Sequence, residues 1–252
     1  MAILWSKTLN GTHYQVRTAG RSRRLYTDGV FHSQYHPKRA YAGGVWDLLM
    51  LPALFYAPQK IQRVLVLGVG GGAVIHQLKR HIKPRCIVGV ELNPVHLYVA
   101  KHFFAVDKNV AQLHQADAIT WLKNYQGPPF DMIIEDLFGE KDGEPVRAIA
   151  PEAPWFRLLA RNLTAHGLLV MNFLDKESLR ECAWFHHAAS RKKFKHAFMF
   201  TLKLYDNAVA AYLKVAPDSE GLRESVLQQP GLGSAVKSDK LQYRMRVLKA
   251  GS

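Results

Sequence analysis

Short apolar runs alternate with amphipathic stretches from Arg63 to Val215. Continuous apolar runs of this kind are typical of strands buried on both faces, and the amphipathic stretches are typical of covering helices. The pattern predicts strands at 63–68, 86–91, 110–115, 131–136, 167–173, 196–203 and 208–215. It predicts helices at 72–82, 95–104, 118–125, 152–163 and 175–193. We therefore expect an α/β domain with a mostly parallel sheet.

The last two predicted strands have no helix between them. Tyr205, Asp206 and Asn207 form a turn that joins them, so one of the two should run antiparallel to the rest. A seven-stranded, mostly parallel sheet with such a terminal antiparallel hairpin is the Rossmann-like class I methyltransferase fold. A plain dinucleotide-binding fold lacks this hairpin.

The flanking regions differ from the centre of the chain. Residues 1–36 alternate like strands, and Asp28-Gly29 is a hairpin signal. An apolar helix is expected at 43–56, with a kink or break at Pro52. Residues 216–235 carry several Pro and Gly and predict an extended or mobile segment, whereas 237–249 predict an edge strand or a short helix. We expect an N-terminal β-rich segment with a connecting helix at 1–60, a catalytic domain at 61–215 and a basic extension at 216–252.

A glycine cluster interrupts the first strand-helix unit. Residues 64–75 read VLVLGVGGGAVI, with Gly68, Gly70 and Gly72 in the loop between strand and helix. Glycine permits a tight turn and lets a ligand approach where a Cβ would block it. Glu91 follows at the end of the second strand, at the spacing of a carboxylate that binds a ribose. The unit predicts a nucleoside-containing ligand.

Acidic residues end three successive strands. They are Glu91, Asp117 and Asp136, and the carboxyl ends of parallel strands are where such sheets bind ligands. Each has a simpler alternative. Asp117 could simply be the N-cap of the following helix, and Glu91 could be an acid that stabilises the start of the next helix. Asp136 could be an acid in a surface loop. All three together are harder to explain in that way.

Composition sets limits on the function. The 252 residues contain 34 Lys and Arg against 20 Asp and Glu, a formal net charge of +14. The basic residues are spread widely, so a cation-rich surface is favoured and nucleic-acid binding stays an alternative. We expect no membrane span and no signal peptide, two reduced thiols (Cys86 and Cys182) and a cytoplasmic location. The 12 histidines form no pattern typical of a metal site.

Several segments between about Leu25 and Val215 carry a recognisable family pattern: LYTDGVFHSQYHP, VLVLGVGGGAVIHQL, VGVELNPVHLYVAKHFF, HQADAITWL and FDMIIEDLFGE. By these segments the chain resembles the spermidine synthase (polyamine aminopropyltransferase) family of the class I methyltransferase superfamily. The resemblance implies that the glycine loop, Gly71 included, contacts an S-adenosyl donor. It implies that Glu91 holds the ribose and that Asp117 with Ala118 holds the adenine. It implies that Asp136 occupies the position of the family's catalytic aspartate and that Gln34 and Tyr35 lie on the acceptor side.

Two positions depart from the family pattern. The glycine loop of the family carries an aspartate facing the amine tail of the donor, where this chain has Gly71, and the second aspartate of an Asp-x-x-Asp motif falls on Gly139. Both changes remove negative charge. A glycine loop at a helix N-terminus suits the carboxylate of S-adenosylmethionine, so the changes favour that donor over its decarboxylated form.

An acidic segment, EDLFGEKDGE at 135–144, follows the fourth strand. We expect Asp136, helped by Glu135, to orient an amine acceptor and take up its proton, while Glu140, Asp142 and Glu144 belong to a solvated loop. The sequence therefore predicts a transferase, with methyl transfer from S-adenosylmethionine slightly favoured. Aminopropyl transfer from decarboxylated S-adenosylmethionine to a polyamine is the first alternative, and a non-catalytic nucleoside- or RNA-binding protein is the second. The sequence names no acceptor and leaves the oligomeric state open, a homodimer included.

Overall fold

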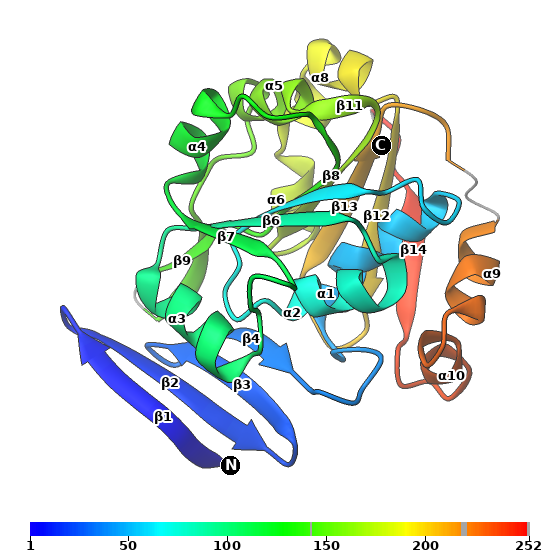
Figure 1. The fold of residues 1–252 in the computed structure, drawn as a ribbon. Coiled ribbons are helices and arrows are strands. Elements are labelled where there is room, and N and C mark those ends of the chain that lie inside the picture. Colours follow the sequence, from blue (N-terminus) through cyan, green and yellow to red (C-terminus); the bar gives the residue numbers. More distant parts are fainter. Residues whose placement is uncertain (142, 218–220, 251–252) are drawn as a thin grey trace.

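The computed structural model describes residues 1–141, 143–217 and 221–250. Its centre is a mixed sheet of eight strands in the order β14-β12-β13-β11-β8-β5-β6-β7 (Figure 1). The strands are β5 (Arg63–Leu67), β6 (Cys86–Glu91), β7 (Gln112–Gln115), β8 (Phe130–Glu135), β11 (Leu163–Phe173), β12 (His196–Leu202), β13 (Ala208–Leu213) and β14 (Tyr243–Val247). The seven strands predicted between residues 63 and 215 are all present.

The direction of the strands confirms the predicted hairpin. β5 pairs in parallel with β6 and β8, β6 with β7, and β8 with β11. β13 lies between β11 and β12 and is antiparallel to both. β14 pairs antiparallel with β12 and adds an eighth strand at the edge. Of the two alternatives for residues 237–249, the edge strand is therefore right.

Helices cover both faces of this sheet (Figure 1). One face packs against α1 (Val45–Met50), a 3₁₀ helix (Leu51–Phe55), α2 (Ala73–Gln77), a π-helical turn (Leu78–Ile82) and α3 (Pro94–Phe103). The other packs against α4 (Ala118–Asn124), α5 (Ala153–Arg161), α6 (Lys176–Arg180), α7 (Ala183–His186) and α8 (Ala188–Lys193). The central strands β5, β8, β11 and β13 are apolar on both sides because each face contributes to its own hydrophobic core.

Three expected helices are interrupted. Pro52 stands at the start of the 3₁₀ helix that follows α1, because proline lacks the amide that an α-helix interior needs. The helix expected at 72–82 changes from α2 to a π-helical turn at Leu78. The helix expected at 175–193 is three short helices, the first capped by a hydrogen bond from the Ser178 amide to the Asp175 carboxylate.

Residues 216–235 correct the sequence prediction. The segment was expected to be extended or mobile, but it contains α9 (Gly221–Gln228) and the start of α10 (Leu232–Lys237), while residues 218–220 lie outside the described part. Leu222, Val226 and Leu232 are buried in the core, which stabilises both helices. The Gly and Pro residues mark the turn between the helices, where Gly231 has a φ of +80°.

The N-terminal residues form a separate antiparallel sheet of β1 (Ala2–Leu9), β2 (Thr12–Ala19), β3 (Ser22–Thr27) and β4 (Val30–Tyr35). It lies beside α3 (Figure 1), where the ring of Trp5 contacts those of Tyr98 and Phe103. Within the acidic segment, β9 (Phe138–Lys141) and β10 (Glu144–Arg147) form a second small hairpin instead of a loop. Asp142 lies outside the described residues.

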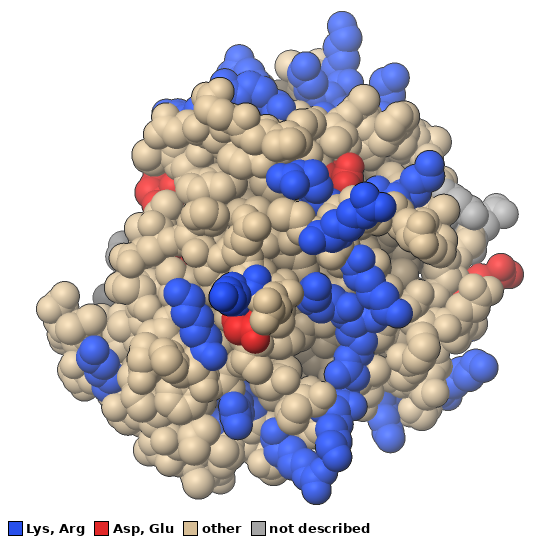
Figure 2. All heavy atoms as spheres, in the orientation of Figure 1, with Lys and Arg blue, Asp and Glu red and all other residues tan. Residues whose placement is uncertain are grey.

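The surface reflects the composition. Figure 2 shows Lys and Arg side chains scattered over one face, with few acidic side chains among them. Within the described ranges, no helix has the length and apolar character needed to cross a membrane.

Candidate functional site

A cavity of about 960 Å³ lies at the carboxyl ends of β5, β6 and β8. The N-terminal sheet contributes Thr27 and Phe31 to its wall, the β9–β10 hairpin contributes Phe138, and the β12–β13 turn contributes Tyr205. Gly68, Gly70, Glu91, Asp117, Ala118 and Asp136 all line it. The structure thus brings most of the predicted site residues to one cavity, at the edge of the sheet where parallel strands end.

Gly68 is required by close packing at the bottom of the cavity. Its φ is +83°, and a Cβ built on it would lie 2.1 Å from the backbone oxygen of Asp136. The Asp136 amide in turn donates to the carbonyl of Leu67, at 2.8 Å. The glycine therefore lets the ends of β5 and β8 approach each other and sets the position of Asp136.

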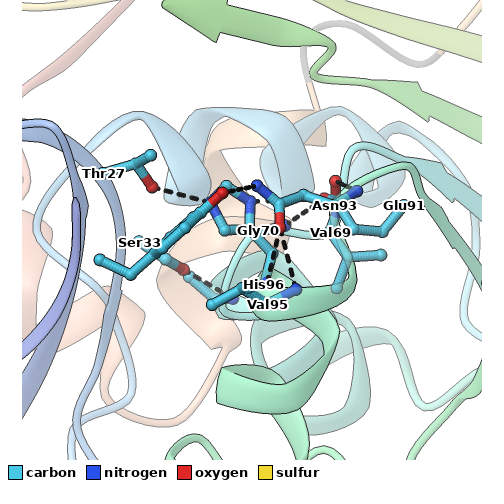
Figure 3. A network of polar contacts seen from close by, with 10 residues as sticks. Thr27, Ser33, Val69, Gly70, Glu91, Asn93, Val95 and His96 are labelled. Atoms are coloured by element: carbon cyan, nitrogen blue, oxygen red, sulfur yellow. Dashed lines mark hydrogen bonds and ion pairs between the residues drawn. The ribbon is translucent and has the colours of Figure 1, made fainter. Parts of the chain in front are cut away.

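Four amides of the glycine loop are already bonded within the protein. Those of Val69 and Gly70 both donate to Glu91 Oε2, at 2.9 and 3.0 Å (Figure 3). The Gly68 amide donates to the carbonyl of Val90, and that of Gly72 to the carbonyl of Val69. The sequence-based expectation that this loop receives a carboxylate is therefore not supported, because these four amides have partners.

Glu91 ends β6 and organises its surroundings. Its Oε1 accepts from the Asn93 amide at 2.9 Å, and its Oε2 lies 3.8 Å from His96 Nδ1 (Figure 3). Burial opposes ionisation of Glu91, but His96 and the amides of Asn93 and Gly70 outweigh it and hold the pKa below its usual value. Glu91 is an ionised acceptor at neutral pH.

Two histidines flank this carboxylate. Nε2 of His96 pairs with the hydroxyl of Thr27 at 2.8 Å, which fixes the ring. The ring centroid of His32 lies 5.0 Å from that of His96. Burial lowers the pKa of His32 to about 4, so His32 is neutral and adds no positive charge to the cavity at neutral pH.

Asp117 begins α4. Its Oδ1 accepts from the Thr120 amide at 2.8 Å, so the helix-cap alternative describes a real contact. The hydrogen bonds of Thr120 lower the pKa of Asp117, and the side chain is exposed at the cavity wall beside Ala118. A capping carboxylate can still meet a ligand, because an ionised carboxylate has more acceptor positions than the Thr120 amide uses.

Asp136 follows β8 directly. Asn172 Nδ2 donates to its Oδ1 at 2.8 Å. Burial raises the pKa of Asp136 to about 6, although the Asn172 hydrogen bond and the charge of Arg147 act in the opposite direction. A carboxylate of this basicity, lining a cavity, is suited to take up a proton near neutral pH.

Some predicted residues do not line the cavity. Glu135 is fully buried, and both its oxygens accept from Arg147 Nη2, at 2.8 and 2.7 Å. Burial raises its pKa although Arg147 opposes this. Glu135 therefore does not line the cavity, and its expected help to Asp136 in orienting an acceptor would have to be indirect.

Gln34 and Tyr35 also lie away from the cavity. Gln34 Oε1 accepts from Arg24 Nε at 2.6 Å, and the ring of Tyr35 stacks on that of His76 at 4.3 Å. Gly71 and Gly72 are buried behind the loop. Their expected contacts with ligand do not match this placement.

The two glycines that depart from the family pattern differ in their surroundings. A Cβ on Gly71 would lie 2.6 Å from the ring of Phe104 and 2.9 Å from Ser33 Cβ, so this space is filled. A Cβ on Gly139 would have no atom within 4 Å, and Gly139 lines the cavity. The first position cannot take a carboxylate without rearrangement, whereas the second can.

The charge of the cavity is opposite to that of the whole chain. Seven acidic residues line it: Asp28, Glu91, Asp117, Asp136, Glu140, Asp175 and Asp206. Among the side chains that the structure describes, no Lys or Arg does so. A low-dielectric cavity lined by one sign of charge attracts ligands of the other sign. The cavity is suited to a cationic ligand.

Sequence reasoning missed several lining residues. Asn172 is the clearest example, because it lies near the carboxyl end of the fifth parallel strand. Ligands bind at such strand ends, so this position could have been predicted. Asn93 caps α3 and could have been found by the Asn-Pro helix start. Trp46 comes from α1, where no local signal marks it. Tyr205 lies in the turn between β12 and β13, which was predicted only as a connection between strands. No group of three or more metal-ligating side chains that could hold an ion occurs in the described ranges.

A family model, the spermine/spermidine synthase domain, matches residues 47–218, which is more than half of the chain. The chain belongs to this family. Polyamine aminopropyltransferase 2 of Caldanaerobacter subterraneus is 31% identical over 139 residues, covering 54% of this chain and 44% of that protein. Polyamine aminopropyltransferase of Mycobacterium tuberculosis is 30% identical over 178 residues, covering 67% of this chain and 32% of that protein. The chain thus spans less than half of these relatives.

Solved structures show the family fold as well. A probable spermidine synthase from Corynebacterium glutamicum superposes with a TM-score of 0.72 at 16% identity, covering 97% of this chain and 91% of that one. A spermidine synthase in complex with the transition-state analogue AdoDATO has a TM-score of 0.63 at 12% identity, covering 90% and 78%. Human methyltransferase-like protein 13 has a TM-score of 0.54 at 19% identity, covering 77% and 90%. This spermidine synthase family member therefore has the class I methyltransferase-like fold that its sequence predicts.

Proposed function

We propose that the protein is an aminopropyltransferase that uses decarboxylated S-adenosylmethionine as donor and a small amine, such as a polyamine, as acceptor. The observation that carries the proposal is the acidic cavity in a strongly basic chain. The curated relatives, which are polyamine aminopropyltransferases, support the same reaction. This reverses the order expected from the sequence, where methyl transfer was slightly favoured.

The charge of the cavity supports a donor without a carboxylate. Decarboxylated S-adenosylmethionine carries a sulfonium and an ammonium and no negative group, so every charge on it is attracted by the lining acids. The carboxylate of S-adenosylmethionine would meet no Lys or Arg among the described lining side chains. A carboxylate without a compensating positive charge is repelled by the acids of such a cavity.

The glycine loop supports the same choice. Backbone amides could have held a carboxylate in place of basic side chains. The amides of Val69 and Gly70 instead bind Glu91, which is itself an anion. A donor carboxylate would have to displace Glu91 from both amides. An ammonium group does not accept hydrogen bonds and therefore requires neither amide.

The chemistry needs alignment and one proton acceptor. The neutral amine of the acceptor attacks the carbon next to the sulfonium, the new C–N bond forms as the C–S bond breaks, and the thioether of methylthioadenosine leaves with the electron pair. The product ammonium then gives a proton to Asp136, whose pKa of about 6 leaves it ionised at neutral pH. Glu91 and Asp117 would hold the ribose and adenine, which leaves positioning as the main task of the site.

Calorimetry with three ligands tests the proposal. Decarboxylated S-adenosylmethionine and methylthioadenosine should bind, and S-adenosylmethionine should bind at least about tenfold more weakly than the decarboxylated donor. Turnover should release methylthioadenosine only when an amine is present. Tighter binding of S-adenosylmethionine would contradict aminopropyl transfer, and binding of none of the three would contradict both transferase functions.

Methyl transfer remains the second candidate because of Gly71. The family aspartate that would face the amine tail is replaced by a glycine, and Phe104 and Ser33 fill the space. A donor amine would therefore rely on other carboxylates of the cavity. The Gly71 departure predicts a weaker preference for the decarboxylated donor than in relatives that keep the aspartate, and the same calorimetry measures that preference.

A further inference from the structure

Arg147, at the end of β10, forms a buried ion pair beneath the cavity. Its Nη2 contacts both oxygens of Glu135, and the two side chains are only 9% and 0% exposed. Removing two charges from water has a free-energy cost of several kcal/mol per ion, so apolar residues of the same size often stabilise a protein as well or better. Stability alone therefore gives little reason for an ion pair at this position.

The contacts of Arg147 lead to Asp136. Its Nη1 donates to the backbone carbonyl of Asn172. The side chain of Asn172 donates from Nδ2 to Asp136 Oδ1 at 2.8 Å and accepts at Oδ1 from Asn207 Nδ2 at 3.2 Å. The Asn172 side chain is thus held by hydrogen bonds at both ends of its amide, and its backbone is held by Arg147.

Arg147 also attaches the β9–β10 hairpin to the sheet. Its guanidinium carbon lies 4.9 Å from the ring centroid of Phe173 in β11 and 5.7 Å from that of Phe138 in β9. Phe138 lines the cavity, whereas neither Arg147 nor Glu135 does. Arg147 therefore affects the cavity only through the groups that it holds.

We propose that Arg147, fixed by Glu135, is a positioning residue that acts through Asn172 to hold the Asp136 carboxylate toward the acceptor. The inference rests on the proposed function for its consequence in catalysis. A positioned proton acceptor requires a fixed orientation, and small displacements of such groups have large effects on rate.

The charges around Asp136 fit this arrangement. Burial raises its pKa, the Asn172 hydrogen bond and the Arg147 charge lower it, and the Glu91 charge raises it again. The neighbouring Glu135 is engaged by Arg147. The network therefore keeps Asp136 in the ionised form that can accept a proton.

A paired substitution tests the inference without leaving an unpaired buried charge. In Glu135→Gln with Arg147→Met, kcat should fall at least about tenfold while KM for the sulfonium donor changes less than about threefold. The control is Arg63→Met, which removes a half-buried arginine from β5 of the large sheet. Arg63 donates to the Tyr125 hydroxyl at 3.1 Å and lies 5.5 Å from the Phe130 ring, outside the cavity. An equal loss of kcat in the control would contradict a positioning role.

A double-mutant cycle shows whether the effect passes through Asn172. If it does, adding the paired substitution to Asn172→Ala should change kcat by no more than about twofold beyond Asn172→Ala alone, because both remove the same contact. Independent losses that multiply would overturn the inference. In the combination of Arg63→Met with Asn172→Ala, the change in kcat should equal the product of the two separate changes.

A measurement without turnover separates this inference from the proposed function. The side-chain amide signals of Asn172 in a nitrogen-proton spectrum should shift with pH around the pKa of Asp136, about 6, and Asp136→Asn should abolish that shift. In the paired variant the shift should be lost. The same shift in the paired variant as in the wild type would overturn the positioning role, even if no donor proves active.

Discussion

The backbone oxygen of Asp136 lies only 2.1 Å from the position that a Cβ would take on Gly68. This contact joins the glycine loop to the strand end that carries the proposed proton acceptor. It makes the first glycine of the loop a packing requirement of the protein, in addition to its place in the cavity wall.

Gly68→Ala should lower the free energy of unfolding by at least about 3 kcal/mol and weaken donor binding, because the strand ends must separate. Gly11→Ala is the matched control, since Gly11 has the same φ of +83° but nothing within 4 Å of a Cβ. It should lose only about 1 kcal/mol from backbone strain. Equal losses in chemical denaturation would show that the Asp136 contact is unimportant.

Asp136→Asn should reduce kcat at least about a hundredfold and leave donor affinity nearly unchanged, because it removes the proton acceptor. Activity of the wild-type protein should fall as pH decreases through about 6, where the raised pKa of Asp136 leads to its protonation. A pH profile of kcat measures this. Unchanged turnover of Asp136→Asn with the true acceptor would remove Asp136 from the mechanism.

Asp117→Asn separates a helix cap from a ligand contact. Asparagine caps helices as well as aspartate does, so thermal stability should stay within about 0.5 kcal/mol. If Asp117 also accepts from the adenine amine, donor affinity should fall about tenfold, because the change replaces a charged acceptor by a neutral one. Calorimetry that finds unchanged affinity would leave Asp117 with the capping role alone.

Gly139→Asp should restore a carboxylate at the acceptor side without loss of stability, because nothing lies within 4 Å of its Cβ. We expect KM for a cationic acceptor to fall about two- to fivefold, as for a partly exposed ion pair. Gly71→Asp should instead destabilise the protein by about 1–3 kcal/mol, because its side chain would meet Phe104. A stable Gly71→Asp variant would contradict the packing described for this loop.

Glu91→Gln should weaken donor binding and lower stability by about 1–3 kcal/mol. The Val69 and Gly70 amides both donate to Glu91 Oε2, and an amide nitrogen at that position would leave both without an acceptor. Denaturation and calorimetry together measure the two effects. A variant with normal stability and affinity would show that the loop does not depend on this carboxylate.

Much of the fold follows from periodicity. The seven strands between residues 63 and 215 and the antiparallel β13 are predicted because burial on both faces leaves continuous apolar runs, and the turn at Asn207 leaves no room for a helix. The helices of residues 221–237 were missed because their Gly and Pro residues dominate the local pattern, while the contacts that stabilise them come from a distant core. The division of 175–193 into three helices was missed because that segment contains no Gly or Pro to mark its breaks.

The candidate site divides in the same way. Glu91, Asp117 and Asp136 are predicted from the sequence alone, because each stands at the end of a strand and strand ends of a parallel sheet converge. Gln34 and Tyr35 were placed by family resemblance, and the structure turns both away from the cavity toward Arg24 and His76.

The sequence by itself determined the order of the elements, the glycine loop and the edge of the sheet at which the acids meet, since these depend on local spacing. Only the tertiary structure decided what each group does there. It bonds the Val69 and Gly70 amides to Glu91, fills the space beside Gly71 with Phe104 and engages Glu135 with Arg147. These contacts join residues far apart in the chain, so no local pattern specifies them. They support the proposal of a donor that lacks a carboxylate.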